Sequence, residues 1–383
     1  MKKILFITTR NPYSGRYSGD VIRAKKIIKY LRKKNSVVAV FLTKKNEIAK
    51  VDNNKKNVFF ESPNIIKKVF YCITNIFKLK PLQFGLFYSN DMANYINENA
   101  KDFDVLFFHQ IRSSQYLPSD FYGNTVLEMG DLYSDNYKQT FKNLNFFNTL
   151  KYIYLLESFL VKRVEDLIFN SFDKIILFSK SEIKKIGKKY KKKIYHISES
   201  VQTIKKIHKI SPNNYKILFI GNLGYTPNIM ACKEFIRNVL PDLKKIVPNI
   251  EFNIIGNIKP LDKFLLSLNK NTKILGQQKK IDKFISNCIC GIANLQVATG
   301  VQGKVLTYMS YGLPVICSEK TSLNFNKNVL IYKKNKELVN LVFNLKNNVK
   351  LNKKFSQNSL TFIKNFYWKK VSLNYSKIVS FNK

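Results

Sequence analysis

Short apolar runs alternate along the first half of the chain with longer stretches in which apolar residues recur every three or four positions. A short, continuous apolar run is typical of a buried strand, and the longer period is typical of a helix packed on one face. The runs that predict strands cover residues 3–9, 36–42, 104–110, 124–129, 173–179 and 193–198. The periodic stretches that predict helices cover residues 20–33, 65–77, 87–99, 144–172 and 182–190.

A polar segment over residues 202–214 interrupts this alternation, which then restarts. The second set of predicted strands covers residues 215–222, 250–256, 272–276, 288–295, 314–318 and 328–332, with helices between them and a long helical stretch over 353–380. Strands that alternate with helices indicate a mostly parallel sheet covered on both faces. The sequence therefore predicts an α/β protein with two Rossmann-like, doubly wound domains, residues 1–205 and 206–352. Ligands of such sheets bind at the carboxyl ends of the strands, here in the cleft between the domains.

The sequence predicts neither a metal site nor export from the cell. Five cysteines are scattered through apolar stretches, and Cys288 and Cys290 alternate in one predicted strand, which favours reduced thiols in a core. The three histidines include no pair at ligand spacing, so we expect no protein-bound metal and no cofactor. The first residues lack the apolar segment of a signal peptide, and no run of about 18 apolar residues predicts a membrane span. We expect a cytoplasmic protein.

The formal net charge of +41 raises the question of nucleic-acid binding. Only seven residues are arginine, which proteins use for bidentate contacts to bases, and the 59 lysines are spread along the whole chain. Lysine, asparagine, isoleucine, phenylalanine and tyrosine are abundant together, as an AT-rich coding sequence would produce. We expect no nucleic-acid partner. A strongly positive surface attracts phosphate-bearing substrates and anionic lipid headgroups. We therefore expect the protein to attach peripherally to the inner face of the cell membrane.

The segments after the predicted strands exclude several classes of nucleotide-binding protein. A dinucleotide-dependent dehydrogenase needs G-x-G-x-x-G after its first strand, and TTRNPYSGRYSG does not supply it. The glycines of GNLGYTPN have the wrong spacing, and no Walker A motif is present. A periplasmic-type binding protein would need an export signal.

Two segments of the second half, residues 219–256 and 298–318, resemble family 4 glycosyltransferases of the GT-B fold. The stretch ATGVQGKVLTYMSYGLPVICS is similar to the G-I-Q-N-K-V-L-E-A-M-A-M-G-L-P-V-V motif of a bacterial sugar-transferase subgroup. In the first half, GDVIRAKKIIKYL is similar to the G-D-x-I-R helix of that subgroup. Trp368 matches the tryptophan on the family's last helix, which returns to the first domain. The resemblance therefore assigns part of residues 353–383 to that domain.

The resemblance implies a retaining glycosyltransferase that moves a sugar from a nucleotide-diphosphate donor to a lipid-linked or growing cell-surface polysaccharide. The residues implied in donor binding are Gly221, Asn222, Gly300, Val301, Gln302, Gly303, Lys304 and Thr307. Backbone N–H groups at a helix N-terminus bind diphosphates, and Lys304 would stabilise the charge of the leaving group. The resemblance also implies that the loop with Gly15, Gly19 and Asp20 lies where the donor phosphates and the acceptor meet. His109, at the end of strand 104–110, is a second catalytic candidate in the cleft.

A structural interpretation stays open for each of these residues. The glycines are also what tight turns require, and His109 also suits a core position in which both ring nitrogens are satisfied. Lys304 is one of many lysines, and only its place within G-V-Q-G-K-V-L singles it out.

The chain departs from the family at positions that bear on catalysis. Many members carry two glutamates, separated by seven residues, where this chain has Thr299 and Thr307. The subgroup's arginines before the motif appear as Gln296 and Thr299, and the Arg and Lys near the first strand of the second domain are absent, with Asn228 in that region. A threonine hydroxyl is a weaker partner for ribose than a carboxylate. The alternative function is a catalytically inactive GT-B scaffold or binding protein of the same pathway.

Overall fold

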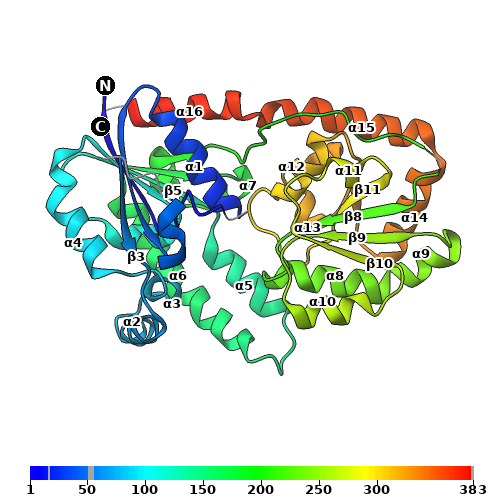
Figure 1. The fold of residues 1–383 in the computed structure, drawn as a ribbon, viewed down its shortest axis with the longest axis horizontal. Coiled ribbons are helices and arrows are strands. Elements are labelled where there is room, and N and C mark those ends of the chain that lie inside the picture. Colours follow the sequence, from blue (N-terminus) through cyan, green and yellow to red (C-terminus); the bar gives the residue numbers. More distant parts are fainter. Residues whose placement is uncertain (16–17, 51–55, 212, 381–383) are drawn as a thin grey trace. The chain divides into compact units, whose positions relative to one another are not determined.

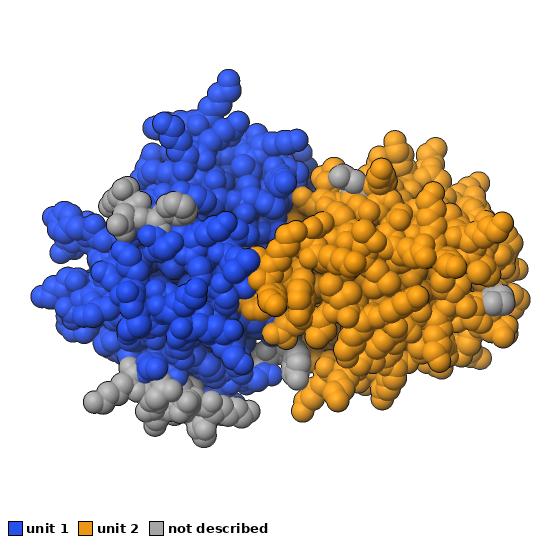
Figure 2. All heavy atoms as spheres, turned by 90° about the horizontal axis from the view of Figure 1, so that it is seen from above, with its two compact units in different colours: residues 1–198, 372–383 blue, residues 199–371 orange. Residues whose placement is uncertain are grey.

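The structure, a computed structural model, describes all residues except 16–17, 51–55, 212 and 381–383 (Figure 1). The chain divides into two compact units, one made of Met1–Ser198 with Ser372–Lys383 and the other of Glu199–Val371 (Figure 2). We call them the first and the second unit. Each contains one parallel sheet flanked by helices, so the predicted α/β class with two Rossmann-like domains is confirmed.

The first unit has a seven-stranded parallel sheet in the order β3-β2-β1-β4-β5-β6-β7. Its strands are β1 (Lys3–Thr8), β2 (Ser36–Thr43), β3 (Asn57–Glu61), β4 (Val105–His109), β5 (Asn124–Gly130), β6 (Lys174–Leu177) and β7 (Ile194–His196). Its α-helices are α1 (Gly19–Leu31), α2 (Ile65–Phe77), α3 (Leu82–Gly85), α4 (Asn90–Asn99), α5 (Tyr133–Asn143), α6 (Leu150–Ser171) and α7 (Lys180–Ile183). Its 3-10 helices are η1 (Lys45–Lys50), η2 (Ala100–Asp102), η3 (Ile111–Tyr116) and η4 (Lys188–Lys193).

The middle strands of this sheet are buried on both faces. In β1 the residues after Lys3 are all buried, and β4 is buried along its whole length. Strand β1 pairs in parallel with β2 on one side and with β4 on the other, so Thr8 lies next to His109 at the carboxyl ends. Near-continuous apolar runs are what a parallel sheet covered on both faces requires. This register brings the residues that follow β1, β4 and β5 to one edge of the sheet.

The second unit has a six-stranded parallel sheet in the order β10-β9-β8-β11-β12-β13. Its strands are β8 (Lys216–Ile220), β9 (Glu251–Ile255), β10 (Thr272–Gly276), β11 (Cys288–Ala293), β12 (Val315–Ser318) and β13 (Leu330–Tyr332). Its helices are α8 (Thr226–Asn238), α9 (Leu240–Ile246), α10 (Pro260–Ser267), α11 (Asp282–Ile285), α12 (Gly303–Ser310), α13 (Glu319–Ser322), η5 (Asn326–Asn328), α14 (Asn335–Asn347), α15 (Val349–Ile363) and η6 (Lys364–Phe366). The reversal of strand order at β8 and β11 places the β8–α8 turn and the β11–α12 loop at the same edge of the sheet.

The chain ends in helix α16 (Trp368–Ser380), whose last residues belong to the first unit. Val371, Tyr375, Ile378 and Val379 are buried. Lys174 of β6 donates from Nζ to the main-chain oxygen of Ile378 at 3.0 Å. The last residues of the chain therefore pack on the first unit, whose sheet is formed by residues up to Ser198.

Several predicted helices differ from the structure in their bounds. The stretch predicted as one helix over 353–380 breaks at residues 364–367 into α15 and α16, and the helix predicted from residue 144 begins at Leu150. The helix predicted over 182–190 is the short α7 followed by η4, with Gly187 between them. The predictions contained no strand over Asn57–Glu61, because β3 is a short edge strand whose residues are only half-buried.

Candidate functional site

The turn after β8 is closed by contacts within the protein. A side chain at Gly221 would approach Asn228 to about 2.9 Å, and one at Gly256 would lie 1.7 Å from the main-chain oxygen of Gly221. Asn222 accepts a hydrogen bond from the Gly224 amide at 3.0 Å, and its own carbonyl accepts one from Asn228 Nδ2 at 2.8 Å. A side chain at position 221 would therefore displace the Asn228 amide from its contacts in this turn.

Lys304 reaches this same turn from the first residues of α12. Its ammonium donates to Asn228 Oδ1 at 2.6 Å and lies 4.2 Å from the centroid of the Phe219 ring. Burial lowers the pKa of Lys304 to about 7, and the nearby thiols of Cys232 and Cys317 offset this only in part. Among the described residues no carboxylate pairs with it. Lys304 is thus a half-buried cation that is held by a neutral amide and an aromatic face.

The loop before α12 carries the other donor residues that the sequence singled out. Gly300 has a φ of 64°, a conformation that favours glycine, and its carbonyl accepts from Asn324 Nδ2 at 2.7 Å. Thr299 is buried, and its carbonyl accepts from Gln302 Nε2 at 2.8 Å. These contacts order the loop, and Val301 at its centre is half-buried against the core.

The first turn of α12 contains a glycine that the protein itself does not require. A side chain at Gly303 would meet no atom within 4 Å, and its φ is not in the left-handed region. Thr307, four residues on, donates its hydroxyl back to the Gly303 carbonyl at 2.9 Å. The structure therefore brings Gly303, Lys304 and Thr307 together on one turn, with open space beside the amide that begins the helix.

In the first unit, Asp20 is part of an ion-pair cluster. It accepts from Arg10 at 2.9 Å and from Arg112 at 3.0 Å, and both guanidinium groups lie over the ring of Phe87. Burial raises the pKa of Asp20, but the charges of Arg10 and Arg112 outweigh burial and lower it overall. One carboxylate faces two arginines, so the cluster keeps a positive charge.

The glycines of the predicted phosphate loop lie beside this cluster. Gly15 has a φ of 74°, whereas Gly19 opens α1 without such a constraint, and a side chain at either would meet nothing within 4 Å. Residues 16–17 between them lie outside the described residues. The structure therefore leaves space at Gly19 and supplies cations from Arg10 and Arg112, while Asp20 is already paired.

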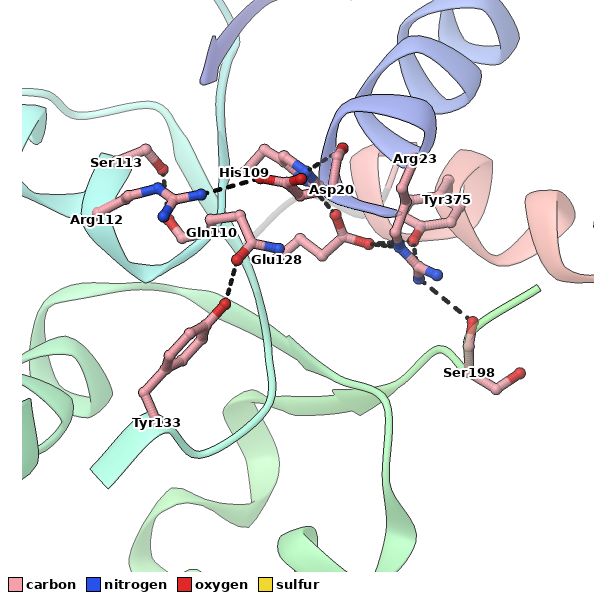
Figure 3. Close-up of polar contacts among 10 residues, drawn as sticks. All are labelled: Asp20, Arg23, His109, Gln110, Arg112, Ser113, Glu128, Tyr133, Ser198 and Tyr375. Atoms are coloured by element: carbon pink, nitrogen blue, oxygen red, sulfur yellow. Dashed lines mark hydrogen bonds and ion pairs between the residues drawn. The ribbon is translucent and has the colours of Figure 1, made fainter. Parts of the chain in front are cut away.

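His109 lies in the interior of the first unit. It is 1% exposed, and its Nδ1 lies 2.5 Å from Glu128 Oε2 while its Nε2 lies 3.0 Å from the Asp20 carbonyl (Figure 3). Both partners are acceptors, so a ring nitrogen that carries a proton has an acceptor opposite it. Both ring nitrogens are engaged within the unit, and the catalytic role of His109 stays a prediction. His109 links the end of β4 to β5 and to the start of α1.

Glu128 is the centre of the network that Figure 3 shows. Its carboxylate accepts from Arg23 Nε at 2.5 Å and from the hydroxyl of Tyr375. Burial raises the pKa of Glu128, but Arg23 and His109 outweigh burial and lower it to about 2. Arg23 also donates to the Ser198 carbonyl and lies 3.9 Å from the centroid of the Phe178 ring. The buried Arg23 guanidinium thus has a carboxylate as its direct partner.

Comparison with known proteins defines the architecture. Residues 214–347 match a family model described as "Glycosyl transferases group 1". No curated protein matches the chain in sequence. The solved structure of HepE from Anabaena in complex with UDP and glucose is 12% identical, with a TM-score of 0.70 over 99% of this chain and 100% of that chain. The chain has the GT-B fold.

Two further GT-B structures match over nearly the whole chain. Sucrose-phosphate synthase from Thermosynechococcus elongatus is 12% identical, with a TM-score of 0.69 over 99% of this chain and 98% of that chain. A TarM mutant from S. aureus, in complex with Fondaparinux, alpha-GlcNAc-glycerol and UDP, is 11% identical, with a TM-score of 0.65 over 100% of both chains. The glycosyltransferase match covers the sheet of the second unit, including β8, α8 and α12.

Sequence analysis missed the arginine cluster and the Glu128 network of this GT-B chain. Arg10 and Arg112 follow two strands that are neighbours in the sheet, so their meeting was predictable from strand order. Arg23 stands in the quoted GDVIRAKK helix, and Glu128 is the one acid in the apolar run NTVLEM. A charged residue in a buried strand needs a buried partner.

One cavity of the first unit lies apart from all of these residues. It has a volume of about 450 Å³ and is lined by residues of α5, α6 and the segment 185–190, among them Phe141, Phe159 and Tyr190. It includes no residue singled out above. Within the described part of the chain, no group of three or more His, Cys, Asp or Glu is placed to hold a metal ion, and no helix is long and apolar enough to cross a membrane.

Proposed function

We propose that this protein is a family 4-type glycosyltransferase that moves a sugar from a nucleotide-diphosphate donor to a lipid-linked or growing saccharide acceptor, with retention of configuration. Transfer breaks the bond between the sugar C1 and the diphosphate and forms a bond between C1 and an acceptor hydroxyl oxygen. The observation that carries the proposal is Lys304, a half-buried cation on the first turn of α12 inside the matched region, which has no carboxylate partner among the described residues.

The charge of Lys304 suits a leaving diphosphate. A lysine that is partly withdrawn from water and bonded to a neutral amide is stabilised when an anion binds, because the anion supplies the missing countercharge. Negative charge on the diphosphate increases as the bond to C1 breaks, so a fixed cation stabilises the transition state more than the ground state. The open space at Gly303 leaves the first amides of α12 accessible to the same phosphates.

The substrates of structural relatives support the donor class. HepE was solved with UDP and glucose, and also with UDP-glucose. The TarM structure holds UDP and alpha-GlcNAc-glycerol. We propose a nucleotide-diphosphate sugar for this chain, with no protein-bound metal or other cofactor. We also propose a cytoplasmic location with peripheral attachment to anionic membrane, because lysine provides most of a net charge of +41.

The second candidate function is an inactive GT-B scaffold. It is favoured by Thr299 and Thr307 at positions where many relatives carry glutamate. Thr299 is buried, and the Thr307 hydroxyl donates to its own helix. Neither residue supplies a carboxylate for the ribose hydroxyls of a donor.

A screen of nucleotide diphosphates and their sugars by thermal unfolding separates the two candidates. A ligand present at about 100 times its Kd stabilises the folded state by about 2.7 kcal/mol. We expect one nucleotide family to raise the Tm of the full chain, and its sugar conjugate to be hydrolysed or transferred in the presence of a chelator. If no nucleotide shifts the Tm and none is turned over, the scaffold function holds. A requirement for added metal would contradict the metal-free proposal.

A further inference from the structure

Helix α2 of the first unit turns its apolar side away from the protein. A surface helix normally buries its apolar stripe against the core and exposes its polar face. In α2 no residue is fully buried, and Ile66 and Phe77 are 79% and 82% exposed. The large apolar residues that α2 exposes to solvent are Ile65, Ile66, Val69, Phe70, Ile73, Ile76 and Phe77.

The opposite side of α2 is held on the protein through polar and medium-sized residues. Cys72 Sγ donates to the Leu82 carbonyl at 3.3 Å, and Asn75 Nδ2 donates to the Pro81 carbonyl at 3.2 Å. A side chain at Gly85 of α3 would lie 2.6 Å from the backbone of Cys72, so the two helices touch closely. These contacts set the rotation of α2 and direct its apolar residues outward.

A second exposed apolar strip lies on the loop before α6 and on its first turns. Its exposed members are Phe146, Phe147, Leu150, Tyr152, Ile153, Leu156 and Phe159. Glu157 of α6 accepts from the Leu82 amide at the start of α3, so α6 and α2 are joined through α3. Figure 1 shows α2 and this end of α6 along the same edge of the first unit. We call the exposed residues of α2 and this strip the apolar edge.

The charged residues of α2 itself and of the segment that directly follows it are all basic. Lys67, Lys68, Lys78 and Lys80 lie on or directly after the helix, and no acidic residue occurs between Asn64 and Lys80. A short amphipathic helix with lysines beside an apolar face is suited to lie in the plane of a lipid surface. At about 1.5 Å per residue, α2 presents an apolar stripe about 20 Å long.

We propose that the apolar edge inserts into the headgroup region of an anionic lipid bilayer, with α2 lying in the membrane plane and its lysines on acidic headgroups. This deepens the proposed peripheral attachment, which overall charge alone would make loose and fully reversible by salt. The occupant is a lipid surface and not an acidic protein, because the face is mainly aliphatic and aromatic and its lysines stand at its borders. Insertion of apolar side chains persists when salt screens the lysines.

The test measures binding of the full chain to vesicles, without any nucleotide sugar. The two vesicle types are phosphatidylcholine alone and phosphatidylcholine mixed with phosphatidylglycerol. We expect binding to the mixed vesicles that high salt weakens without abolishing. The variant Ile66→Asn/Phe77→Asn should bind about tenfold or more weakly, since burying one large apolar side chain is worth at least about tenfold.

Two matched controls distinguish binding through the apolar edge from nonspecific hydrophobic adsorption and from binding through the overall charge. Leu261→Asn/Phe264→Asn removes two exposed apolar residues of α10 in the second unit and should leave binding unchanged. Lys67→Glu/Lys78→Glu should weaken binding to the mixed vesicles, whereas Lys353→Glu/Lys354→Glu, with the same change in net charge, should weaken it much less. Unchanged circular dichroism would show that the variants fold.

Several results would overturn the proposal. Binding lost completely at high salt, or equal for the α2 and α10 variants, would leave only the overall charge. No vesicle binding, together with a dimer that Ile66→Asn/Phe77→Asn converts to a monomer, would make the apolar edge an interface between copies of this chain. Transfer to a water-soluble acceptor is measured separately on the same variants. Failure of membrane binding and failure of the glycosyltransferase proposal are therefore distinguishable.

Discussion

Two cations of this protein, the buried Arg23 in the first unit and the half-buried Lys304 in the second, have opposite surroundings. Arg23 contacts the Glu128 carboxylate at 2.5 Å, and His109 and Tyr375 bind the same carboxylate. Lys304 has a neutral amide and a ring as partners. The pKa of Glu128 is lowered to about 2 by its partners, whereas burial lowers the pKa of Lys304 to about 7.

The difference separates a structural network from a binding residue. A buried charge with a complete set of partners holds the fold together, and loss of one partner is strongly destabilising. A cation that is partly desolvated without an anion destabilises the folded state, and a ligand that supplies the countercharge would remove this cost. Both sites lie at the carboxyl ends of parallel strands, so position in the fold alone does not distinguish them.

The largest effect is expected for Glu128→Gln, which removes the carboxylate that Arg23, His109 and Tyr375 share. The buried Arg23 would then lose the charge of this partner, and we expect the free energy of unfolding to fall by about 3–5 kcal/mol. Urea unfolding of the parent and the variant measures the change. Glu337→Gln is the control, because its carboxylate accepts a hydrogen bond at the surface and should change stability by less than about 0.5 kcal/mol. A loss below about 1 kcal/mol for Glu128→Gln would mean that the network is not structural.

The next effect concerns turnover and is expected for Lys304→Ala. Removing one preorganised contact to a transition-state charge typically lowers kcat about 10²–10³-fold, or roughly 3–4 kcal/mol. Turnover of the nucleotide sugar identified by the thermal screen gives the rate. Lys320→Ala is the matched control, because Lys320 also donates to a neutral carbonyl of the second unit but is exposed. If Lys304→Ala keeps the parent's rate, the diphosphate does not bind at α12.

A smaller effect of opposite sign is expected on stability for Lys304→Met, which replaces the half-buried ammonium by an apolar group. In the absence of nucleotide, we expect the free energy of unfolding to rise by on the order of 1–3 kcal/mol. The parent's penalty is complete below pH 7, where Lys304 is charged in both states. It disappears as pH rises from about 7 towards the value near 10.5 of an unfolded lysine. The stability gap between variant and parent should therefore shrink over that range, and a gap independent of pH would contradict the lowered pKa of Lys304.

Much of the fold follows from the sequence because parallel strands buried on both faces are nearly continuous apolar runs. The runs KILFIT and VLFFH predict β1 and β4 directly. Strand β3 was not predicted, since an edge strand with half-buried residues has no continuous apolar run. The break between α15 and α16 was not predicted either, because the helical pattern continues on both sides of residues 364–367.

The candidate site was predictable only in part. Lys304 stands within a motif, so sequence indicated it, but its partner Asn228 lies on another helix and becomes visible only when α8 and α12 meet. His109 was placed correctly at the end of β4, yet its role depends on Glu128 of the neighbouring strand. One sequence without a structure does not show which buried charges find partners.

The last and smallest prediction concerns Thr307, which separates an active enzyme from a scaffold. Thr307 follows Lys304 by three residues, so the two lie on neighbouring positions of one helix face. The Thr307 hydroxyl donates to the Gly303 carbonyl at 2.9 Å. A carboxylate at this position can accept from both ribose hydroxyls, and hydrogen bonds to charged groups contribute about 1.5–3 kcal/mol. Since a new side chain is rarely placed ideally, we expect Thr307→Glu to tighten nucleotide binding by about tenfold, which calorimetry resolves.

Two controls identify the origin of any gain at Thr307. Thr307→Gln has nearly the same shape without the charge and should gain less, and a 2′,3′-dideoxy nucleotide should show no gain with Thr307→Glu, because it lacks the hydroxyls. A gain that persists with the dideoxy nucleotide would place the new carboxylate elsewhere. If neither the parent nor Thr307→Glu binds any nucleotide, the space beside Gly303 is not a donor site, and the unpaired Lys304 belongs to an inactive scaffold.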